Sequence, residues 1–278
     1  MNVFKNATRR QALSALGRVA AGLAALFTVK HVKAAVQGAV STPAPKGYDP
    51  TAHQWQMAID VEKCIGCGLC AEACKKENHV PKEPGYFRTW VERYIIKKPK
   101  AGAMVMHGEV VMARGETVVD SPNGGIGGFS PSAVPKPEIL KSFFVPKLCN
   151  LCRHSPCDQA CPVGATFRSP DGVVLVDWKY CIGCSFCVQA CPYGCRFISP
   201  VTHTAEKCTL CYHRITHGLK PACVEICPTG SRIFGDLKDL SPSNPLRKFY
   251  ENRKLQTLKP HLGTEPHVFY AGLDGEVR

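Results

Sequence analysis

Cysteine spacing constrains this chain more than any other feature of its 278 residues. Sixteen of the 17 cysteines fall into four groups of four: Cys64-x2-Cys67-x2-Cys70-x3-Cys74, Cys149-x2-Cys152-x4-Cys157-x3-Cys161, Cys181-x2-Cys184-x2-Cys187-x3-Cys191 and Cys208-x2-Cys211-x11-Cys223-x3-Cys227. Neighbouring sulfurs in such tight loops point toward a common centre, which suits a metal and gives poor disulfide geometry. Each group therefore offers four metal ligands, and Cys195 is left over.

The third group, in which Pro192 follows Cys191, indicates which metal is bound. A C-x2-C-x2-C-x3-C-P run is the motif of bacterial ferredoxins, in which the fourth cysteine ligates the other [4Fe–4S] cluster of a pair. Zinc also accepts four cysteines, so a structural zinc module without a redox role stays open as the alternative. Exported cysteine-rich chains usually carry disulfides, but the grouped spacing argues against that interpretation.

Internal repeats accompany the cysteine groups. Residues 57–67 parallel residues 174–184, and in both a short alternating apolar run leads into a glycine-containing cysteine loop. Such a run predicts a strand before the loop. The last three groups end alike, in cysteine, proline, a glycine turn and an apolar strand, whereas the first continues into Lys75-Lys76-Glu77-Asn78. The repeats predict an α+β fold that uses the βαβ half-unit of a ferredoxin about four times, with a modified exit in the first.

The order of the four groups, with the long gap in the last, resembles the four-cluster ferredoxin subunits of the molybdopterin oxidoreductase superfamily. These are the subunits of the dimethyl-sulfoxide, polysulfide and tetrathionate reductase B type. Residues 196–208, 219–230 and 262–267 look most similar to the iron–sulfur subunit of the formate-dependent nitrite reductase system. The fold that this resemblance implies is a pair of bacterial-type ferredoxin units with long loops and an inserted hairpin.

The resemblance also implies that the first group shares clusters with the fourth, and the second with the third. The implied ligand sets are Cys64, Cys67, Cys70 and Cys227; Cys74, Cys208, Cys211 and Cys223; Cys149, Cys152, Cys157 and Cys191; and Cys161, Cys181, Cys184 and Cys187. Every position is cysteine, so four [4Fe–4S] clusters are expected. Cys195 is expected to pack without ligating, because the sister repeats carry Ala165 and Ser231 at its position.

No catalytic residue stands out, because all sixteen ligands are used and no nucleophile, metalloprotease or nucleotide-binding fingerprint occurs. The resemblance implies an electron-transfer subunit rather than an enzyme acting alone. Its implied partners are a quinone-reactive integral membrane subunit and a molybdopterin- or haem-containing catalytic subunit.

The first 34 residues predict an export signal. Arg9 and Arg10 precede an apolar run, Val19–Val29, that is shorter than the about 20 residues a bilayer span needs. Val32 and Ala34 suit cleavage after Ala34, and the paired arginines are similar to a twin-arginine signal. The expected location is the periplasm, peripheral to the inner membrane, with an uncleaved anchor helix as the alternative.

The net charge of +13 would ordinarily suggest nucleic acid as a partner. Six of the basic residues lie in the predicted signal, which leaves 29 basic against 22 acidic side chains, or +7. An oxidised [4Fe–4S] cluster with four thiolates carries about −2, so four clusters contribute about −8. We therefore interpret the basic excess as compensation for clusters and expect no nucleic-acid partner.

These expectations divide the chain into six segments. They are a signal over 1–34, a linker over 35–54, a first ferredoxin unit formed by 55–98 and 202–240, an inserted hairpin and loop over 99–137, a second ferredoxin unit over 138–201, and a C-terminal tail over 241–278.

Overall fold

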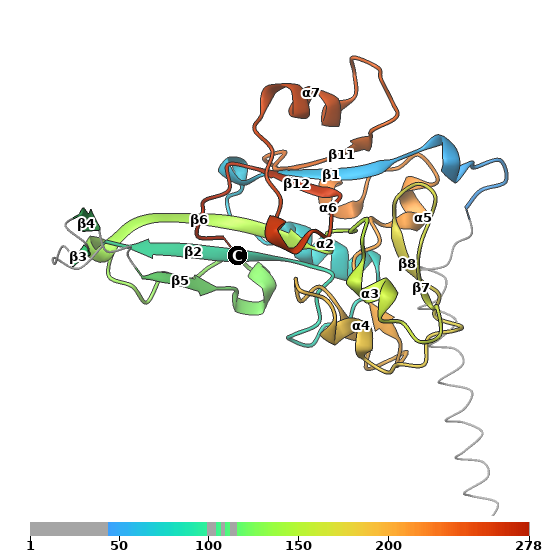
Figure 1. The fold of residues 1–278 in the computed structure, drawn as a ribbon, viewed down its shortest axis with the longest axis horizontal. Coiled ribbons are helices and arrows are strands. Elements are labelled where there is room, and N and C mark those ends of the chain that lie inside the picture. The colour runs from blue at the N-terminus through green and yellow to red at the C-terminus, as the bar shows by residue number, and fades with distance from the viewer. Residues whose placement is uncertain (1–43, 99–103, 107–108, 112–115, 278) are drawn as a thin grey trace, which may run out of the picture.

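The computed structural model describes residues 44–98, 104–106, 109–111 and 116–277. The predicted signal and residues 35–43 of the predicted linker lie outside the described residues. The described chain forms a body of short strands and helices, from which one long ladder extends to the side (Figure 1). Within these residues, no helix combines the length and the apolar character that a bilayer crossing requires.

Four strands lead into the four cysteine groups, and we term them incoming strands. Two of them, those before the first and third groups, lie where the alternating apolar runs predict strands. The incoming strands are β1 (Trp55–Asp60), β6 (Ile139–Leu148), β8 (Val174–Val176) and β10 (Ala205–Glu206).

Four outgoing strands follow the groups. The last three begin shortly after the glycine of each Cys-Pro-x-Gly turn, as the sequence predicts. The outgoing strands are β2 (Thr89–Lys97), β7 (Thr166–Arg168), β9 (Phe197–Ile198) and β11 (Arg232–Asp236).

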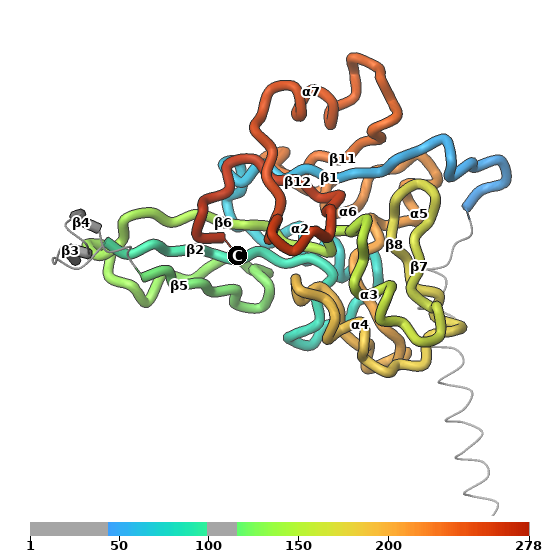
Figure 2. The backbone as a smooth tube through the Cα atoms, viewed as in Figure 1, coloured from blue at the N-terminus to red at the C-terminus, as the bar shows by residue number. Residues whose placement is uncertain are grey.

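These eight strands form four antiparallel pairs in separate sheets, and the pairs follow one another along the chain in a cyclic order that we term the ring of strand pairs. Each outgoing strand pairs antiparallel with the incoming strand of the next group, so β2 pairs with β6, β7 with β8 and β9 with β10. The last outgoing strand, β11, returns to the first incoming strand, β1, with Met57 opposite Phe234. The tube view shows that these distant segments of the chain, drawn in blue and orange, run side by side (Figure 2).

Short helices lie between the strands. In each cysteine group the third cysteine is the second residue of a helix. These helices are α2 (Leu69–Glu77), α3 (Pro156–Gln159), α4 (Phe186–Gln189) and α6 (Ala222–Glu225), and α5 (Tyr212–Ile215) fills the long gap of the fourth group. Helix α2 is longer than the other three, so Cys74 lies inside it, whereas the fourth cysteine of every other group follows its helix.

The segment between β2 and β6 carries the predicted hairpin region. Strands β3 (Met104–Met106) and β4 (Glu109–Val111) pair antiparallel at the far tip of the ladder (Figure 1). Strand β5 (Thr117–Asp120) pairs with β2 instead of joining that hairpin. An ion pair stabilises the pairing of β5 with β2, because Arg93 on β2 donates from Nε to Asp120 Oδ1 at 2.9 Å.

The C-terminal residues pack against the first predicted unit. Helix α7 (Pro245–Asn252) is capped by Asn244, whose Oδ1 accepts from the Leu246 amide at 3.0 Å, and it buries Leu246 against β11. Strand β12 (Val268–Ala271) then pairs parallel with β1. The core that results runs from Tyr270 and Met57 through Val145 to the buried cysteines, so the cysteine groups lie within the core.

Candidate iron–sulfur sites

Three cavities in the core are each lined by four cysteines. The first is lined by Cys64, Cys67, Cys70 and Cys227 and is termed site 1. Site 3 is lined by Cys149, Cys152, Cys157 and Cys191. Site 4 is lined by Cys161, Cys181, Cys184 and Cys187. The same set of four thiols at all three positions suits one kind of occupant.

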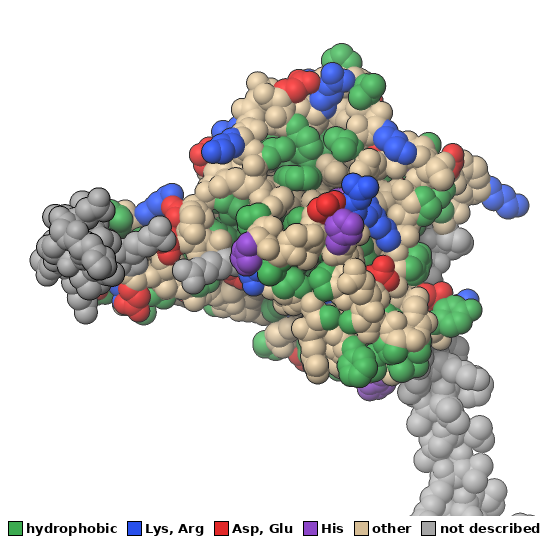
Figure 3. All heavy atoms as spheres, in the orientation of Figure 1, with side chains coloured by type: hydrophobic (Ala, Val, Ile, Leu, Met, Phe, Trp, Pro, Cys, Tyr) green, Lys and Arg blue, Asp and Glu red, His purple; other side chains and the backbone are tan. Residues whose placement is uncertain are grey.

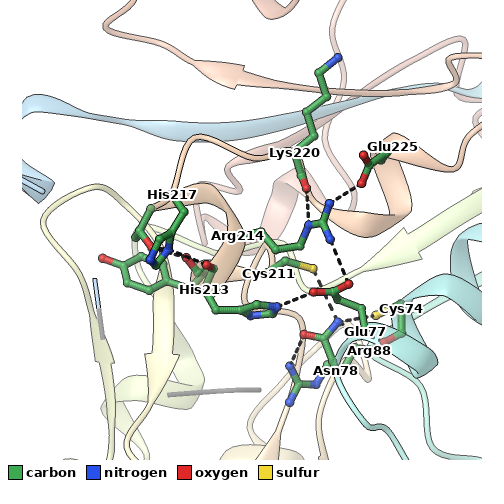
Figure 4. Close-up of polar contacts among 12 residues, drawn as sticks. Cys74, Glu77, Asn78, Arg88, Cys211, His213, Arg214, His217, Lys220 and Glu225 are labelled. Carbon is green, nitrogen blue, oxygen red and sulfur yellow. Dashed lines mark hydrogen bonds and ion pairs between the residues drawn. The ribbon is translucent and has the colours of Figure 1, made fainter. Parts of the chain in front are cut away.

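The other four grouped cysteines, Cys74, Cys208, Cys211 and Cys223, gather in a fully buried position termed site 2. Burial raises the pKa of Cys74 well above its usual value, and the thiols of the other three members raise it further. Asn78 lies between two of them, with Nδ2 3.6 Å from both Cys74 Sγ and Cys211 Sγ (Figure 4). Arg88 holds this amide by donating from Nη1 to Asn78 Oδ1 at 3.0 Å.

The first Cys-x-x-Cys loop of each group makes the same left-handed step. The residue before the second cysteine has a positive φ in each: 71° at Gly66, 49° at Leu151, 71° at Gly183 and 53° at Leu210. This left-handed step turns the chain sharply, so that both sulfurs of the loop face the same cavity. Glycine adopts it readily, whereas leucine incurs about 1–2 kcal/mol of steric strain.

The turns after the last three groups are also alike. The amides of Gly164, Gly194 and Gly230 donate to the carbonyls of Cys161, Cys191 and Cys227, each at 3.3 Å. The following backbone amides then face the cysteine sulfur. Burial opposes ionisation of Cys161, but the amides of Thr166, Val163 and Ala165 outweigh it and lower the pKa of that thiol. The first group lacks the turn, which agrees with its sequence departure after Cys74.

Cys195 adds a contact to this turn in the third group. Its thiol is buried and donates to the Leu148 carbonyl at 3.1 Å. A hydrogen bond from Cys195 is also the main reason that the pKa of Cys191 falls to about 6. The thiol has one proton, so these two acceptors compete for it. In the sister repeat, Ser231 Oγ donates to the Asp60 carbonyl at 2.7 Å.

The donor set fits an iron–sulfur cluster. Four thiols surround each cavity, as a [4Fe–4S] cluster requires, and N–H groups such as the Ala205 amide, 3.3 Å from Cys181 Sγ, face their sulfurs.

Solvent exposure differs among the four sites. All cysteines of site 2 are buried, and only Cys191 of site 3 is partly exposed. In site 4, Cys184 is exposed, and three cysteines of site 1 are partly exposed. Apolar side chains gather on the surface over α3 and α4, beside site 4 (Figure 3). The exposed apolar residues there are Val163, Tyr180, Ile182 and Phe186.

The polar residues that surround the sites were not predicted from the sequence. Nothing in the sequence marks Asn78 as a site residue except its place after the first group, in the stretch that departs from the other repeats. Arg196 and Arg232 had a clearer one, because both stand five residues after the fourth cysteine of their group. His154, in the loop of the second group, lies away from the sulfurs and pairs with Glu265, Nε2 to Oε1, at 3.2 Å.

Two known protein families match the regions of the chain that hold the cysteine groups. A family described as a 4Fe-4S dicluster domain matches residues 140–237, and a 4Fe-4S binding domain matches residues 55–76. The chain is 37% identical to the B subunit of tetrathionate reductase from Salmonella typhimurium over 272 residues, 98% of this chain and 91% of that one. It is 42% identical to the corresponding tetrathionate reductase protein of Archaeoglobus fulgidus, covering 80% and 84% of the two chains. Protein NrfC of Escherichia coli is 32% identical, covering 86% and 89%.

Proposed function

The chain belongs to the family of [4Fe–4S] electron-transfer subunits of reductase complexes, and on that premise we propose that it is a four-cluster relay. It serves its complex as an electron carrier and not as the catalytic subunit. The relay connects a quinone-reactive membrane subunit with a periplasmic catalytic subunit that holds molybdopterin or haem. The observation that carries the proposal is the gathering of sixteen cysteines into sites 1 to 4.

The residues of each site suit the group they would hold. Each site offers four thiolates, and N–H donors such as the Asn78 amide stabilise negative charge on sulfur. When bound, a [4Fe–4S] cluster supplies a centre that takes up and gives back one electron. In the duplicated ferredoxin arrangement, sites 1 and 2 belong to the first unit and sites 3 and 4 to the second.

Neighbouring thiols support a linear order of the sites. Cys223 of site 2 lies near Cys70 of site 1; burial raises the pKa of Cys223, and the nearby Cys70 thiol adds to the rise. Cys208 of site 2 lies near Cys149 of site 3; burial, with these neighbours, raises the pKa of Cys208 to about 11. Between Cys208 and Cys149 stands the buried Lys207, which donates from Nζ to the Cys208 carbonyl at 3.0 Å. Arg196 lies near both Cys157 of site 3 and Cys187 of site 4, so the order is site 1, site 2, site 3, site 4.

The two ends of this order suit two different partners. Sites 1 and 4 each have three exposed or partly exposed cysteines, more than sites 2 and 3, and electrons must enter and leave where a partner can approach. Exposed apolar residues border both ends. They are Ile65, Leu69 and Ile226 at site 1, and Val163, Tyr180, Ile182 and Phe186 at site 4. Such patches mark protein contacts.

Iron content tests the proposal against the zinc alternative. We expect anaerobically purified protein to be brown and to contain about 16 irons per chain, from four clusters of four. A colourless protein with about four zincs, one for each four-cysteine site, would contradict it. Iron near eight per chain would leave a two-cluster ferredoxin and contradict the four-cluster relay.

Export is the part of the proposal that rests on residues 1–34. The paired arginines support transport of a folded, cluster-loaded chain to the periplasm. Replacing Arg9 and Arg10 together by lysine should leave the chain in the cytoplasm with its iron content unchanged, as cell fractionation would show. Periplasmic accumulation of this double variant would contradict twin-arginine export while leaving the electron-relay proposal intact.

A further inference from the structure

Two buried arginines lie beside the cysteine sites, and neither forms an ion pair with a carboxylate in the described part of the chain. Arg196 is 5% exposed and Arg232 is 3% exposed. Two nitrogens of each guanidinium, Nε and Nη2 of Arg196 and Nε and Nη1 of Arg232, have no hydrogen-bond partner among the described residues. Arg88 provides the contrast, because this equally buried arginine forms an ion pair with Glu206 at 3.1 Å.

Each of the two arginines lies between two sites. Arg232 lines the cavity of site 1, and its charge acts on Cys70 of site 1 and Cys223 of site 2. Arg196 lines the cavity of site 3, and its charge acts on Cys157 of site 3 and Cys187 of site 4. One guanidinium therefore lies near cysteines of both sites in each predicted ferredoxin unit.

The anchoring of the two arginines is also equivalent. Arg232 Nη2 donates to Thr89 Oγ1 at 2.7 Å, and Arg196 Nη1 donates to Thr166 Oγ1 at 3.1 Å. Thr89 and Thr166 are the first residues of outgoing strands β2 and β7, in the other half of the same unit. Each threonine accepts from one nitrogen and leaves two nitrogens of its arginine without a hydrogen-bond partner among the described residues.

Physical chemistry explains why an unpaired cation stands there. A buried charge is unstable unless an opposite charge faces it, and the anionic groups beside these arginines are the cysteine sulfurs. Arginine keeps its charge in a dry site, and its planar fork presents donors in more than one direction. A thiolate-ligated cluster changes from about −2 to about −3 when it accepts one electron, with no proton needed for balance. A neighbouring cation stabilises the more negative state more strongly.

We propose that Arg196 and Arg232 are the fixed counter-charges of the two cluster pairs, each raising the reduction potentials of both clusters between which it lies. This inference rests on the proposed function, since it concerns clusters in sites 1 to 4. Arg232 raises the reduction potentials of the clusters in sites 1 and 2, and Arg196 raises those in sites 3 and 4. Both act as positioning and tuning residues and contribute no ligand to iron.

The test is an EPR-monitored redox titration of the full chain in its native complex. Signals are assigned to sites with Cys67→Ala for site 1 and Cys184→Ala for site 4. We expect Arg196→Met to shift the midpoint potentials of sites 3 and 4 to more negative values and to leave sites 1 and 2 unchanged. Arg232→Met should do the reverse, so each variant is the matched control of the other. Methionine keeps the apolar stem and removes the charge.

Lysine variants separate charge from shape. Arg196→Lys and Arg232→Lys should keep wild-type potentials, because an ammonium replaces the guanidinium charge. Where a methionine variant loses iron, its lysine counterpart decides: four clusters at wild-type potentials support the inference, and loss of iron there too overturns it. Unchanged potentials in a fully iron-loaded methionine variant, or equal shifts at all four sites, also overturn it. A wild-type chain without iron would instead contradict the proposed function itself.

Discussion

At the scale of single residues, Cys195, the seventeenth cysteine, allows a cluster ligand to be distinguished from a cysteine that only packs beside one. Cys195 donates to the Leu148 carbonyl, whereas Cys191 lines site 3. We expect Cys195→Ala to retain about 16 irons per chain, and Cys191→Ala to lose the cluster of site 3. Iron analysis and EPR distinguish the two outcomes, and loss of iron from Cys195→Ala would show that Cys195 is a ligand.

The stability of the Cys195 variants follows from the same contacts. Removing the thiol leaves the buried Leu148 carbonyl with fewer donors, at a cost of about 1 kcal/mol in the free energy of unfolding. Cys195→Ser is the control, because Ser231 makes the corresponding bond to Asp60 in the sister repeat. We expect the serine variant to unfold at the wild-type denaturant concentration and the alanine variant earlier.

His267 makes stability depend on pH. Its side chain is buried, and desolvation, with the charges of Arg168 and Arg153 adding and that of Glu265 opposing, lowers its pKa to about 4. Arg168 Nη2 lies 3.2 Å from His267 Nε2, which therefore accepts as neutral imidazole. The unfolded chain binds this proton near pH 6.5, so stability is fully present above that pH and falls as pH drops toward 4.

The loss amounts to about 3 kcal/mol, from 1.36 kcal/mol for each unit of pKa difference. Unfolding measured at pH 7.5 and pH 5 should show a smaller difference for His267→Gln than for the wild type. The exposed His261 supplies the control variant, His261→Gln, which should keep the wild-type pH dependence. An equal pH dependence in all three proteins would contradict a buried neutral His267.

At the scale of the elements, the cysteine loops depend on close backbone approach. Gly183 has φ +71°, and a Cβ there would stand 2.4 Å from the His203 carbonyl oxygen. We expect Gly183→Ala to displace the loop of Cys181 and Cys184 and to lose about four of about 16 irons. Gly164→Ala is the control: φ there is also positive, at +64°, but no atom lies within 4 Å of the added Cβ. Normal iron content in Gly183→Ala would contradict this dependence.

Local chemistry made several elements predictable. The strands after Cys161, Cys191 and Cys227 follow from proline and glycine at fixed offsets, because a turn needs only neighbouring residues. The strand before Cys64 follows from its alternating apolar pattern. By contrast, Leu151 and Leu210 adopt a left-handed conformation without glycine. The left-handed conformation there depends on the tertiary packing of the loops, so the type of these two residues does not predict it.

Long-range elements were not predictable for a related reason. The pairing of β12 with β1 joins residues about 210 apart in sequence, and neither strand specifies a parallel partner by its own pattern. The same holds for β5, whose alternation suits either the hairpin tip or β2. The Arg93–Asp120 ion pair stabilises the pairing with β2, and the sequence alone does not show that these two residues meet. The hydrogen bonds from Arg232 to Thr89 and from Arg196 to Thr166 likewise join residues that the sequence alone does not bring together.

At the scale of the whole molecule, the cysteine sites hold the core together. Cys70, Cys149, Cys208 and Cys223 are members of the main buried cluster, together with Met57, Leu148 and Tyr270. We therefore expect removal of iron by chelation to expose the chain to limited proteolysis throughout the body, because binding energy of the metal groups contributes to folding. An iron-free chain as protease-resistant as the loaded one would contradict this expectation.

The ring of strand pairs has a consequence for how the chain is made. Synthesis proceeds from the N-terminus, so β6 to β8 and the second and third cysteine groups leave the ribosome as one continuous stretch and can assemble at once. Strand β1 and the first group, although made earlier, find their partners only when β11 and the fourth group emerge. Among the described strands, β1 is thus synthesised first and yet pairs only after most of the chain has been made.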